Sequence, residues 1–533
     1  MQKCKHITFY KVFVYLVYVF GFWFLIFNFS FAAPLDNIQT DSWIYDAVDY
    51  LKTAGYIQTI PPTSKPWTRK EVIEIIKETD LNQPYPNRQV GFYLFRLLDE
   101  FSSEIPNEKS HLKRKPPIKI DYGQGNLHVN PYLNLTHNQL PYWLTPYGNN
   151  IFPDNQTAAF GLSFSLDQNS KISLYNHSEV MFFRKQIENS ETTGTSMFHV
   201  PGTRWMYSFH YISMQSFLRF DSKQAYLAFP ISILTLELGR DNIYWGPAYR
   251  SSVMLSDIAP SFDHIQLRTG GKKFKAMWFF SALSRLDHFH RFMSGQRFEI
   301  NIGKNTRLGG SMLSVFSFDS LQTKNFFPYL NPLVPIYFEV DNTGQDDNLL
   351  VSFDFTAYIR QVRIYGHLMV DNYEFNTKPN RPPNCYGLTF GAFLPIHQFA
   401  LRTEYSKITR YTYYHRILHI AYTSYSVPLG HSLGPDADEL FLRLECFPRN
   451  DMQINLVGTI TRRGDGNRGT LADKTWFVDD PRPESFPSGT VIKTILLGPE
   501  IFYQPRYNLT VRAGIYYNVD KKLNSFIKLS YQV

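Results

Sequence analysis

Past Ile118 the chain alternates apolar and polar residues over many short segments, which is the period of β-strands that have one apolar face. In the segment 351–356, for example, Val, Phe and Phe alternate with Ser, Asp and Thr. The same alternation covers the segments 127–136, 160–167, 298–302, 509–518 and 527–533. The pattern therefore predicts a mainly β protein built from many antiparallel strands, the last two of which form a hairpin at the end of the chain.

The apolar face of these strands carries no charged residue, and this favours lipid over a second protein sheet as its neighbour. A lipid-facing strand must exclude charge, because Arg at the bilayer midplane costs about 2–4 kcal/mol, whereas the outer face of a β-sandwich has no such restriction. After Phe29 the chain has no apolar run of the about 20 residues that a membrane-spanning helix needs. We therefore expect a large antiparallel transmembrane β-barrel with an even number of strands, about 16–18. A soluble β-sandwich is the alternative.

Residues 41–104 have the period of helices instead. Ile44, Ala47, Val48 and Leu51 have the spacing of one helix face, and Gly55 follows to end that helix. Thr68 to Glu71 has the spacing of a capping box and predicts the start of a second helix. A third apolar stripe consists of Val90, Leu94, Leu97, Leu98 and Phe101. So small a helical module needs support, and we expect it to pack against the periplasmic end of the barrel.

The N-terminus has the features of an export signal. Lys3, Lys5 and Lys11 precede the apolar run 12–29, and Ser30-Phe31-Ala32 supplies the small residues of a cleavage site. An uncleaved anchor is the alternative. The predicted organisation is a signal peptide at 1–32, a helical periplasmic module at 33–108, a basic linker at 109–117 and an outer-membrane β-barrel at 118–533.

Composition agrees with this organisation. Aromatic residues make up 17% of the chain, which suits the interfacial girdles and lipid face of a barrel. The net charge of +8 is compatible with acidic polymers or anionic lipid headgroups as partners. Nucleic acid is not an expected partner, because the charge is dispersed along an exported chain. Outer-membrane lipid and, during biogenesis, the barrel-assembly machinery are the other expected partners.

The most distinctive stretch runs from Leu236 to Leu267 and contains Tyr244-Trp245-Gly246-Pro247. Aromatic rings offer flat faces to the C–H surfaces of sugars, and guanidinium groups donate to hydroxyls or carboxylates. Arg240, Tyr244, Trp245 and Arg250 are therefore candidate glycan-binding residues. The alternative is structural, because Trp beside Gly-Pro also builds a rigid turn that plugs a lumen or anchors an interface.

This stretch resembles the capsule assembly Wzi family of outer-membrane proteins. The resemblance rests on Gly239-Arg240, Trp245-Gly246-Pro247, Leu255-Ser256-Asp257 and Ala259-Pro260, and on Asn331-Pro332 as a second landmark. It implies a bacterial outer-membrane barrel with a helical periplasmic part that acts as a surface lectin and helps retain or assemble capsular or extracellular polysaccharide. A channel for sugars or other solutes is the alternative function.

No catalytic, metal or cofactor site is expected. His288 and His290 alternate and could share a strand face, but no nucleophile motif accompanies them. Cys385 and Cys446 lie too far apart in sequence to predict whether they pair. We therefore expect a non-enzymatic protein without a cofactor.

Overall fold

The structure is a computed structural model. It describes residues 35–79, 88–102, 104–105, 118–122, 125–138, 155–168, 172–186, 207–211, 214–286, 288–319, 327–338, 347–372, 383–396, 398–415, 417–425, 427–464, 485–506, 508–518 and 523–532. The predicted signal peptide and the predicted basic linker lie outside the described residues, so their boundaries stay predictions.

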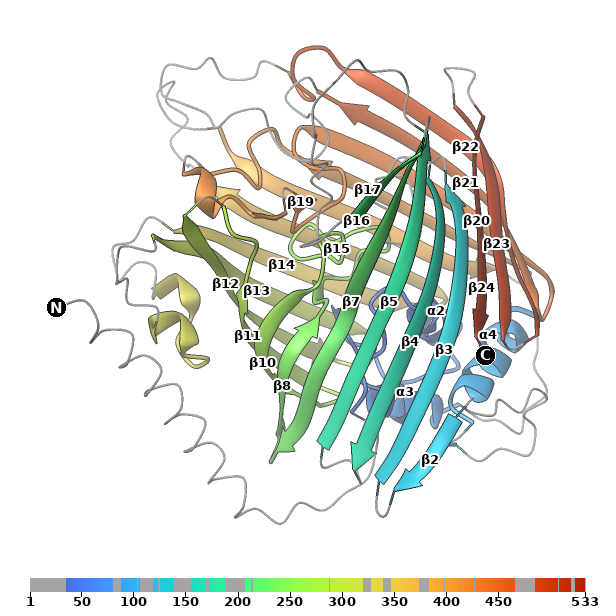
Figure 1. Cartoon of the computed structure of the whole chain (residues 1–533). Helices are drawn as coiled ribbons and strands as arrows, with labels where there is room; N and C mark the ends of the chain where they lie inside the picture. The colour runs from blue at the N-terminus through green and yellow to red at the C-terminus, as the bar shows by residue number, and fades with distance from the viewer. Residues whose placement is uncertain are drawn as a thin grey trace.

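Most of the described chain forms a closed antiparallel barrel of 18 strands (Figure 1). The strands of the ring are β3 (Gly125–Asn138), β4 (Asn155–Gln168), β5 (Ile172–Gln186), β7 (Met214–Ile231), β8 (Leu234–Asp241), β10 (Phe262–Thr269), β11 (Phe274–Ala282), β12 (Phe289–Ile302), β13 (Thr306–Asp319), β14 (Asn348–Ile359), β15 (Val362–Asn372), β16 (Cys385–Ile396), β17 (Phe399–Ile408), β20 (Ala437–Arg449), β21 (Met452–Arg463), β22 (Ile492–Arg506), β23 (Leu509–Asn518) and β24 (Leu523–Gln532). β24 pairs with β3, Leu529 opposite Leu135, and so closes the ring. The predicted fold class and strand number are confirmed.

Short strands add to this ring. β2 (Ile118–Tyr122) pairs with β3, and β6 (Tyr207–Tyr211) pairs with β7. Two further pairs belong to segments between the barrel strands or before them: β1 (Ser64–Lys65) with β9 (Tyr244–Trp245), and β18 (Thr423–Ser424) with β19 (Val427–Pro428).

The two faces of each strand meet different surroundings, as the alternation predicts. In β14 the side chain of Phe353 is 63% exposed, whereas its neighbours Ser352 and Asp354 are buried. Phe298 and Ile300 of β12 are likewise exposed on either side of buried Glu299. The apolar rows therefore point outward and the polar rows point into the barrel. Apolar outward rows on a closed barrel form the surface of a membrane protein.

The connections divide the barrel into two ends. At one end, the short-turn end, strands join through tight turns such as Gly303–Asn305 between β12 and β13 and Asn450–Asp451 between β20 and β21. At the other end, the long-loop end, the connections are long. The polar segments 188–203, 371–384 and 464–488 are expected to be outer loops, and they lie wholly or largely outside the described residues.

The N-terminal helices form as predicted. They are α2 (Trp43–Thr53), α3 (Arg69–Ile76) and α4 (Arg88–Glu100). α2 is followed by Gly55 in the left-handed conformation, with φ +89°. Thr68 and Glu71 form a complete capping box at the start of α3. Among the described helices, none is long and apolar enough to cross a membrane.

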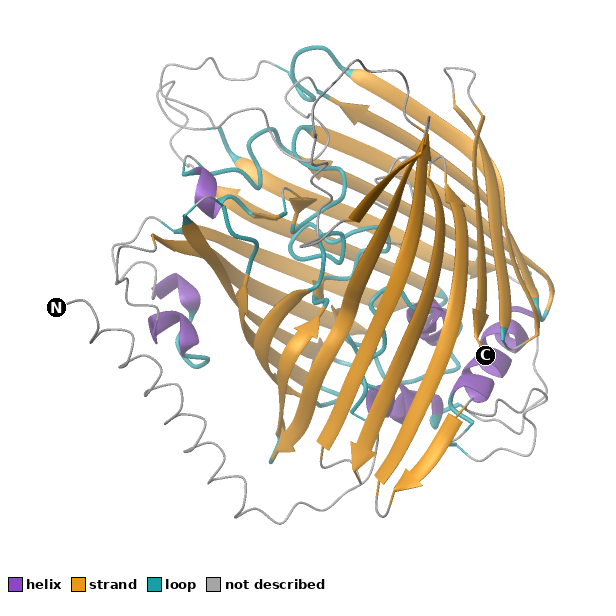
Figure 2. Cartoon of the chain, viewed as in Figure 1, coloured by secondary structure: helices purple, strands orange, loops and turns teal. Residues whose placement is uncertain are grey.

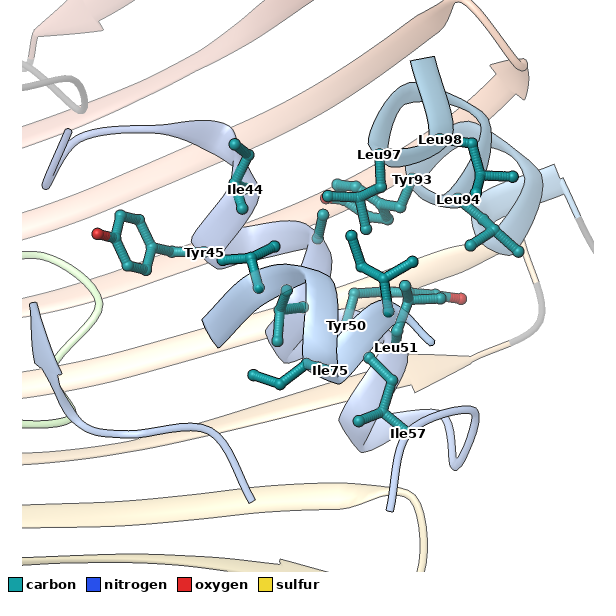
Figure 3. Close-up of a cluster of buried hydrophobic side chains, with 14 of the residues drawn as sticks. Ile44, Tyr45, Tyr50, Leu51, Ile57, Ile75, Tyr93, Leu94, Leu97 and Leu98 are labelled. Carbon is teal, nitrogen blue, oxygen red and sulfur yellow. The ribbon is translucent and has the colours of Figure 1, made fainter. Parts of the chain in front are cut away.

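The helices share their hydrophobic core with the inner wall of the barrel (Figure 3). Leu51 of α2 and Leu97 of α4 are fully buried in one cluster with Phe393 of β16 and Phe447 of β20. Arg88 of α4 donates to the carbonyl of Pro448, beside a short turn. The helices therefore pack at the short-turn end, and α2 and α3 lie within the ring of strands (Figure 2). We expected the helical module only at the end of the barrel, but the segment 35–79 also extends into the lumen.

The outward position of Phe353 gives a test of the lipid-facing surface. Phe353→Arg should destabilise the barrel folded in phospholipid bilayers by about 2–4 kcal/mol, because it places a charge in the hydrocarbon. Ile359 is 56% exposed on the same face of β14 but lies at the short-turn end. Ile359→Arg should cost only about 0–1 kcal/mol. Denaturant titrations of both variants measure the difference, and equal costs would contradict this membrane placement.

Candidate functional site

The distinctive Trp-Gly-Pro stretch lies in the connection between β8 and β10, which we call the 242–261 loop. The loop starts at the long-loop end but folds into the lumen, where β9 pairs with β1 of the N-terminal segment. Gly246 donates from its N–H to the carbonyl of Thr63 at 3.1 Å. Its φ is +129°, and a Cβ would lie 2.4 Å from the Nδ1 of His367, so only glycine fits. The two segments therefore meet inside the barrel.

Tyr244 helps to hold the N-terminal segment in place. The ammonium of Lys65 lies between the rings of Tyr45, at 4.1 Å, and Tyr244, at 4.8 Å. The Tyr244 hydroxyl donates to the carbonyl of Ala248 at 2.7 Å, which fixes the ring within its own loop. Burial lowers the pKa of Lys65. Tyr244 is itself buried, so its ring makes a cation–π contact with Lys65 within the lumen.

Trp245 and Arg250 are buried as well. The Trp245 indole is fully buried and packs edge-on against Phe279 of β11, with ring centroids 5.2 Å apart. Arg250 forms an ion pair with Glu439 at 3.2 Å. The backbone N–H groups of Tyr249 and Arg250 both donate to the carboxylate of Glu404, so the loop is tied to β17 and β20.

Arg240 lies apart from the other three candidate residues. It points outward from β8 and forms two hydrogen bonds, of 2.9 and 2.8 Å, with the carboxylate of Asp263 on β10. Its side chain is 37% exposed. The four residues expected to form a glycan platform are therefore not brought together: three support a turn in the lumen, and one faces outward. Their direct contact with glycan stays a prediction.

A second long connection covers the 242–261 loop. This connection, the 409–436 loop, donates from the hydroxyls of Tyr413 and Tyr422 to the carbonyls of Val253 and Met254, both at 2.7 Å. Ser256 donates from its N–H to Leu429 at 2.8 Å. The pKa of His431 falls to about 3 because the ring is buried and lies near Arg250, so this histidine is neutral at physiological pH. The lumen thus holds three layers: the segment 35–79, the 242–261 loop and the 409–436 loop.

The lowest layer is bound to the inner wall by buried charges. Arg297 of β12 pairs with Asp354 of β14 at 2.7 Å and donates to the hydroxyl of Thr63 at 2.7 Å. Asn37 donates to Glu237 and Asp241 of β8, both at 2.8 Å. Sequence reasoning placed polar residues on the inner face but missed these partners, because each pair joins positions far apart in the chain.

Three further ion pairs attach the helices. Lys275 of β11 lies 2.8 Å from Glu71 of α3. Burial alone would raise the pKa of Glu71, but Lys275 and Arg268 hold it below its ordinary value. Asp49 of α2 pairs with Arg363 of β15 at 2.9 Å and with Arg402 of β17 at 3.2 Å. These contacts join the helices to strands on one side of the barrel.

The described residues contain no group of three or more His, Cys, Asp or Glu side chains that could hold a metal ion. Cys385 and Cys446 are both free thiols. His288 is 58% exposed and lies 3.9 Å from Asp319 at the rim.

A closed barrel with an apolar lipid-facing surface and a lumen occupied by its own chain defines a plugged outer-membrane β-barrel. The chain belongs to the capsule assembly protein Wzi family, whose model matches residues 146–322 and 335–524.

The chain was also compared in fold with solved structures. Wzi of Escherichia coli, described as an outer-membrane protein involved in group 1 capsule assembly and a carbohydrate-binding β-barrel, matches with a TM-score of 0.60 and 14% identity over 94% of this chain and 99% of its own. OccD3 of Pseudomonas aeruginosa gives a TM-score of 0.41 and 9% identity over 79% of this chain and 94% of its own. No curated protein matches the chain in sequence.

The ion pairs of Asp49 predict how firmly the helices are attached. Asp49→Ala leaves two buried guanidinium groups short of a partner and should destabilise the docked segment by about 3–5 kcal/mol. Glu74→Ala changes an exposed carboxylate of α3 and should cost no more than about 0.5 kcal/mol. Limited proteolysis of residues 35–79 in the folded barrel compares the two variants. Equal protease resistance would show that these charges do not hold the segment.

Proposed function

We propose that this barrel binds capsular or extracellular polysaccharide at its long-loop end and helps to retain or assemble it at the cell surface, as a lectin and without catalysis. The layered lumen is the observation that carries the proposal. The 242–261 and 409–436 loops rest on a filled lumen, and their backbones are tied together by hydrogen bonds. A preorganised surface binds a flexible polymer at a lower entropic cost than mobile loops do.

The chemistry at the long-loop end supports the same proposal. Phe289 and His419 stack with centroids 3.6 Å apart, and the ammonium of Lys407 lies 4.2 Å above the ring of Phe486. Aromatic faces beside cationic groups suit sugar rings that carry carboxylates. Within this proposal Arg240 contacts polysaccharide directly, whereas Tyr244, Trp245 and Arg250 position the loop.

The orientation follows from the same proposal. Short turns of outer-membrane barrels face the periplasm and long loops face the outside. We propose that the helical module 33–108 lies on the periplasmic side, continues through the linker 109–117 into the barrel 118–533, and reaches the membrane with the barrel-assembly machinery. Outer-membrane lipid then surrounds the apolar face.

Arg240 offers the sharpest test of polysaccharide contact. Arg240→Gln removes the charge but keeps much of the side-chain length, and it should increase the polysaccharide released from cells several-fold. Lys304→Gln, in a turn at the opposite end, should leave retention unchanged. The ratio of released to cell-bound polysaccharide is measured with equal amounts of folded barrel in the membrane. Normal retention by the Arg240 variant would exclude this contact, and normal retention after gene deletion would exclude the proposed function.

A channel for sugars or other solutes is the competing function. Some inner-facing residues of β23 and β24, Arg512 and Lys528 among them, are only half-buried, so the inner wall is not covered evenly. The layers across the rest of the lumen should nevertheless prevent a steady current. Planar-bilayer recordings should therefore be nearly silent, and the sustained conductance of an open porin would favour the channel instead.

A further inference from the structure

One segment of the chain lies outside the barrel, against its lipid-facing wall. It is residues 327–338, which include η2 (Phe327–Leu330) and the Asn331-Pro332 pair. Figure 1 shows it in yellow beside β12 and β13, outside the ring of strands. The described part of the connection between β13 and β14 therefore lies along the outer surface of the barrel.

The strand residues beneath this segment identify the face that it covers. Arg297 and Glu299 of β12 point into the lumen, so Ser294, Gln296 and Phe298 point outward. Phe298 is 51% exposed, but Ser294 is fully buried and Gln296 is 3% exposed. These two polar side chains are thus outward-facing and yet covered. A membrane strand crosses the hydrocarbon in about 9–11 residues. Gln296 lies near the middle of β12, within that span.

Gln296 satisfies backbone groups of the external segment. Its Nε2 donates to the carbonyls of Val334, at 2.7 Å, and Pro332, at 3.3 Å. Its Oε1 accepts from the N–H of Ile336 at 3.1 Å. The Ser294 hydroxyl adds a bond of 2.9 Å to the carbonyl of Tyr329. Polar side chains on a lipid-facing strand are costly, and here they are used to pair the backbone of a non-strand segment.

The sequence of the segment reduces its need for such partners. Pro328, Pro332 and Pro335 have no backbone N–H to satisfy. The side chain of Asn331 accepts from the N–H of Leu333 at 3.0 Å. No residue from 327 to 338 carries a charge. These features suit a low-dielectric solvent, in which an unpaired backbone group costs several kcal/mol.

The outer side of the segment is apolar and exposed. Leu333 is 89% exposed, Tyr337 50% and Phe338 56%. Beneath it, Tyr329 stacks on Phe316 of β13 with ring centroids 3.9 Å apart, which fixes the segment to the wall. Phe298 and Ile300, which lie on the same outward face of β12 as Gln296, are exposed and apolar as well.

We propose that residues 327–338 are embedded in the hydrocarbon of the membrane, as a re-entrant segment whose exposed face, Leu333, Tyr337 and Phe338, contacts lipid acyl chains. Gln296 and Ser294 are the residues that anchor it. The segment forms a lipid-binding surface on the side of the barrel, separate from the loops at its end and independent of polysaccharide binding.

Spin labelling of the full-length mature chain in phosphatidylcholine vesicles tests this proposal. Leu333→Cys is labelled with a nitroxide in a background carrying Cys385→Ser and Cys446→Ser. Phe353→Cys provides the lipid-exposed reference and Lys304→Cys the aqueous one, and heat-modifiable gel mobility confirms that each barrel is folded. The label at 333 should collide with oxygen as often as the label at 353, and several-fold less often with a water-soluble nickel complex than the label at 304.

Other results at position 333 would overturn the proposal. Nickel accessibility equal to that at 304 would place the segment in water. Low accessibility to both reagents, or spin–spin broadening between molecules, would mean that a protein surface or a second copy of the chain covers it.

The anchoring role of Gln296 has its own matched pair of variants. Gln296→Met keeps the volume but removes all three hydrogen bonds to the segment, and it should raise the nickel accessibility of the label at 333 several-fold. Met312 lies directly opposite Gln296 on β13, so Met312→Leu provides the control. This variant should leave the nickel accessibility of the label at 333 unchanged. An unchanged signal in the Gln296 variant would contradict anchoring by this side chain.

Discussion

Buried charges on the inner wall of the barrel must have partners, and this requirement organises the rest of the molecule. A charge taken out of water without a partner costs several kcal/mol, so Arg297, Arg363 and Arg402 are tolerated inside the lumen only because carboxylates meet them there. Asp49, one of those carboxylates, belongs to the N-terminal segment and not to the wall. The barrel and the segment that fills it are therefore a single electrostatic unit.

The filled lumen determines what the loops can do. The 242–261 loop pairs with the segment beneath it through β1 and β9, and the 409–436 loop rests on the 242–261 loop. Each layer supplies the backbone partners of the next one. The described residues of these two loops are thus held by contacts with the layers beneath them. In the proposed function, this fixed support lowers the entropic cost of binding polysaccharide.

The local pattern of apolar and polar residues was enough to predict the strands and helices, because each of them depends on residues that are neighbours in the sequence. The period of two gave the outward rows that contain Phe298 and Phe353, and the apolar stripe through Val48 and Leu51 gave α2. The motif around Trp245 was recognised, but its environment could not be predicted. Whether Trp245 faces glycan or the lumen depends on a loop that folds inward and pairs with Ser64, far away in sequence.

The external segment 327–338 also depends on contacts between residues far apart in the sequence, which local pattern does not predict. Asn331-Pro332 was visible as a landmark, but nothing in the sequence pattern indicated that Gln296, an outward residue of a distant strand, would pair with its backbone. Alternation predicts which way a side chain points, not what covers it. The sequence also grouped Arg240 with Trp245 as candidate glycan-binding residues, but one residue faces outward and the other lies inside the barrel.

Amide hydrogen exchange of the folded barrel in lipid tests the central claim most directly. If the segment 35–79 and the 242–261 loop are locked together in the lumen, the N–H groups of Trp245 and Gly246, which donate to Leu255 and Thr63, should exchange as slowly as those of the barrel strands. Exchange of these two amides within seconds, as in an unstructured loop, would show that the layers do not form a fixed support and would contradict the account.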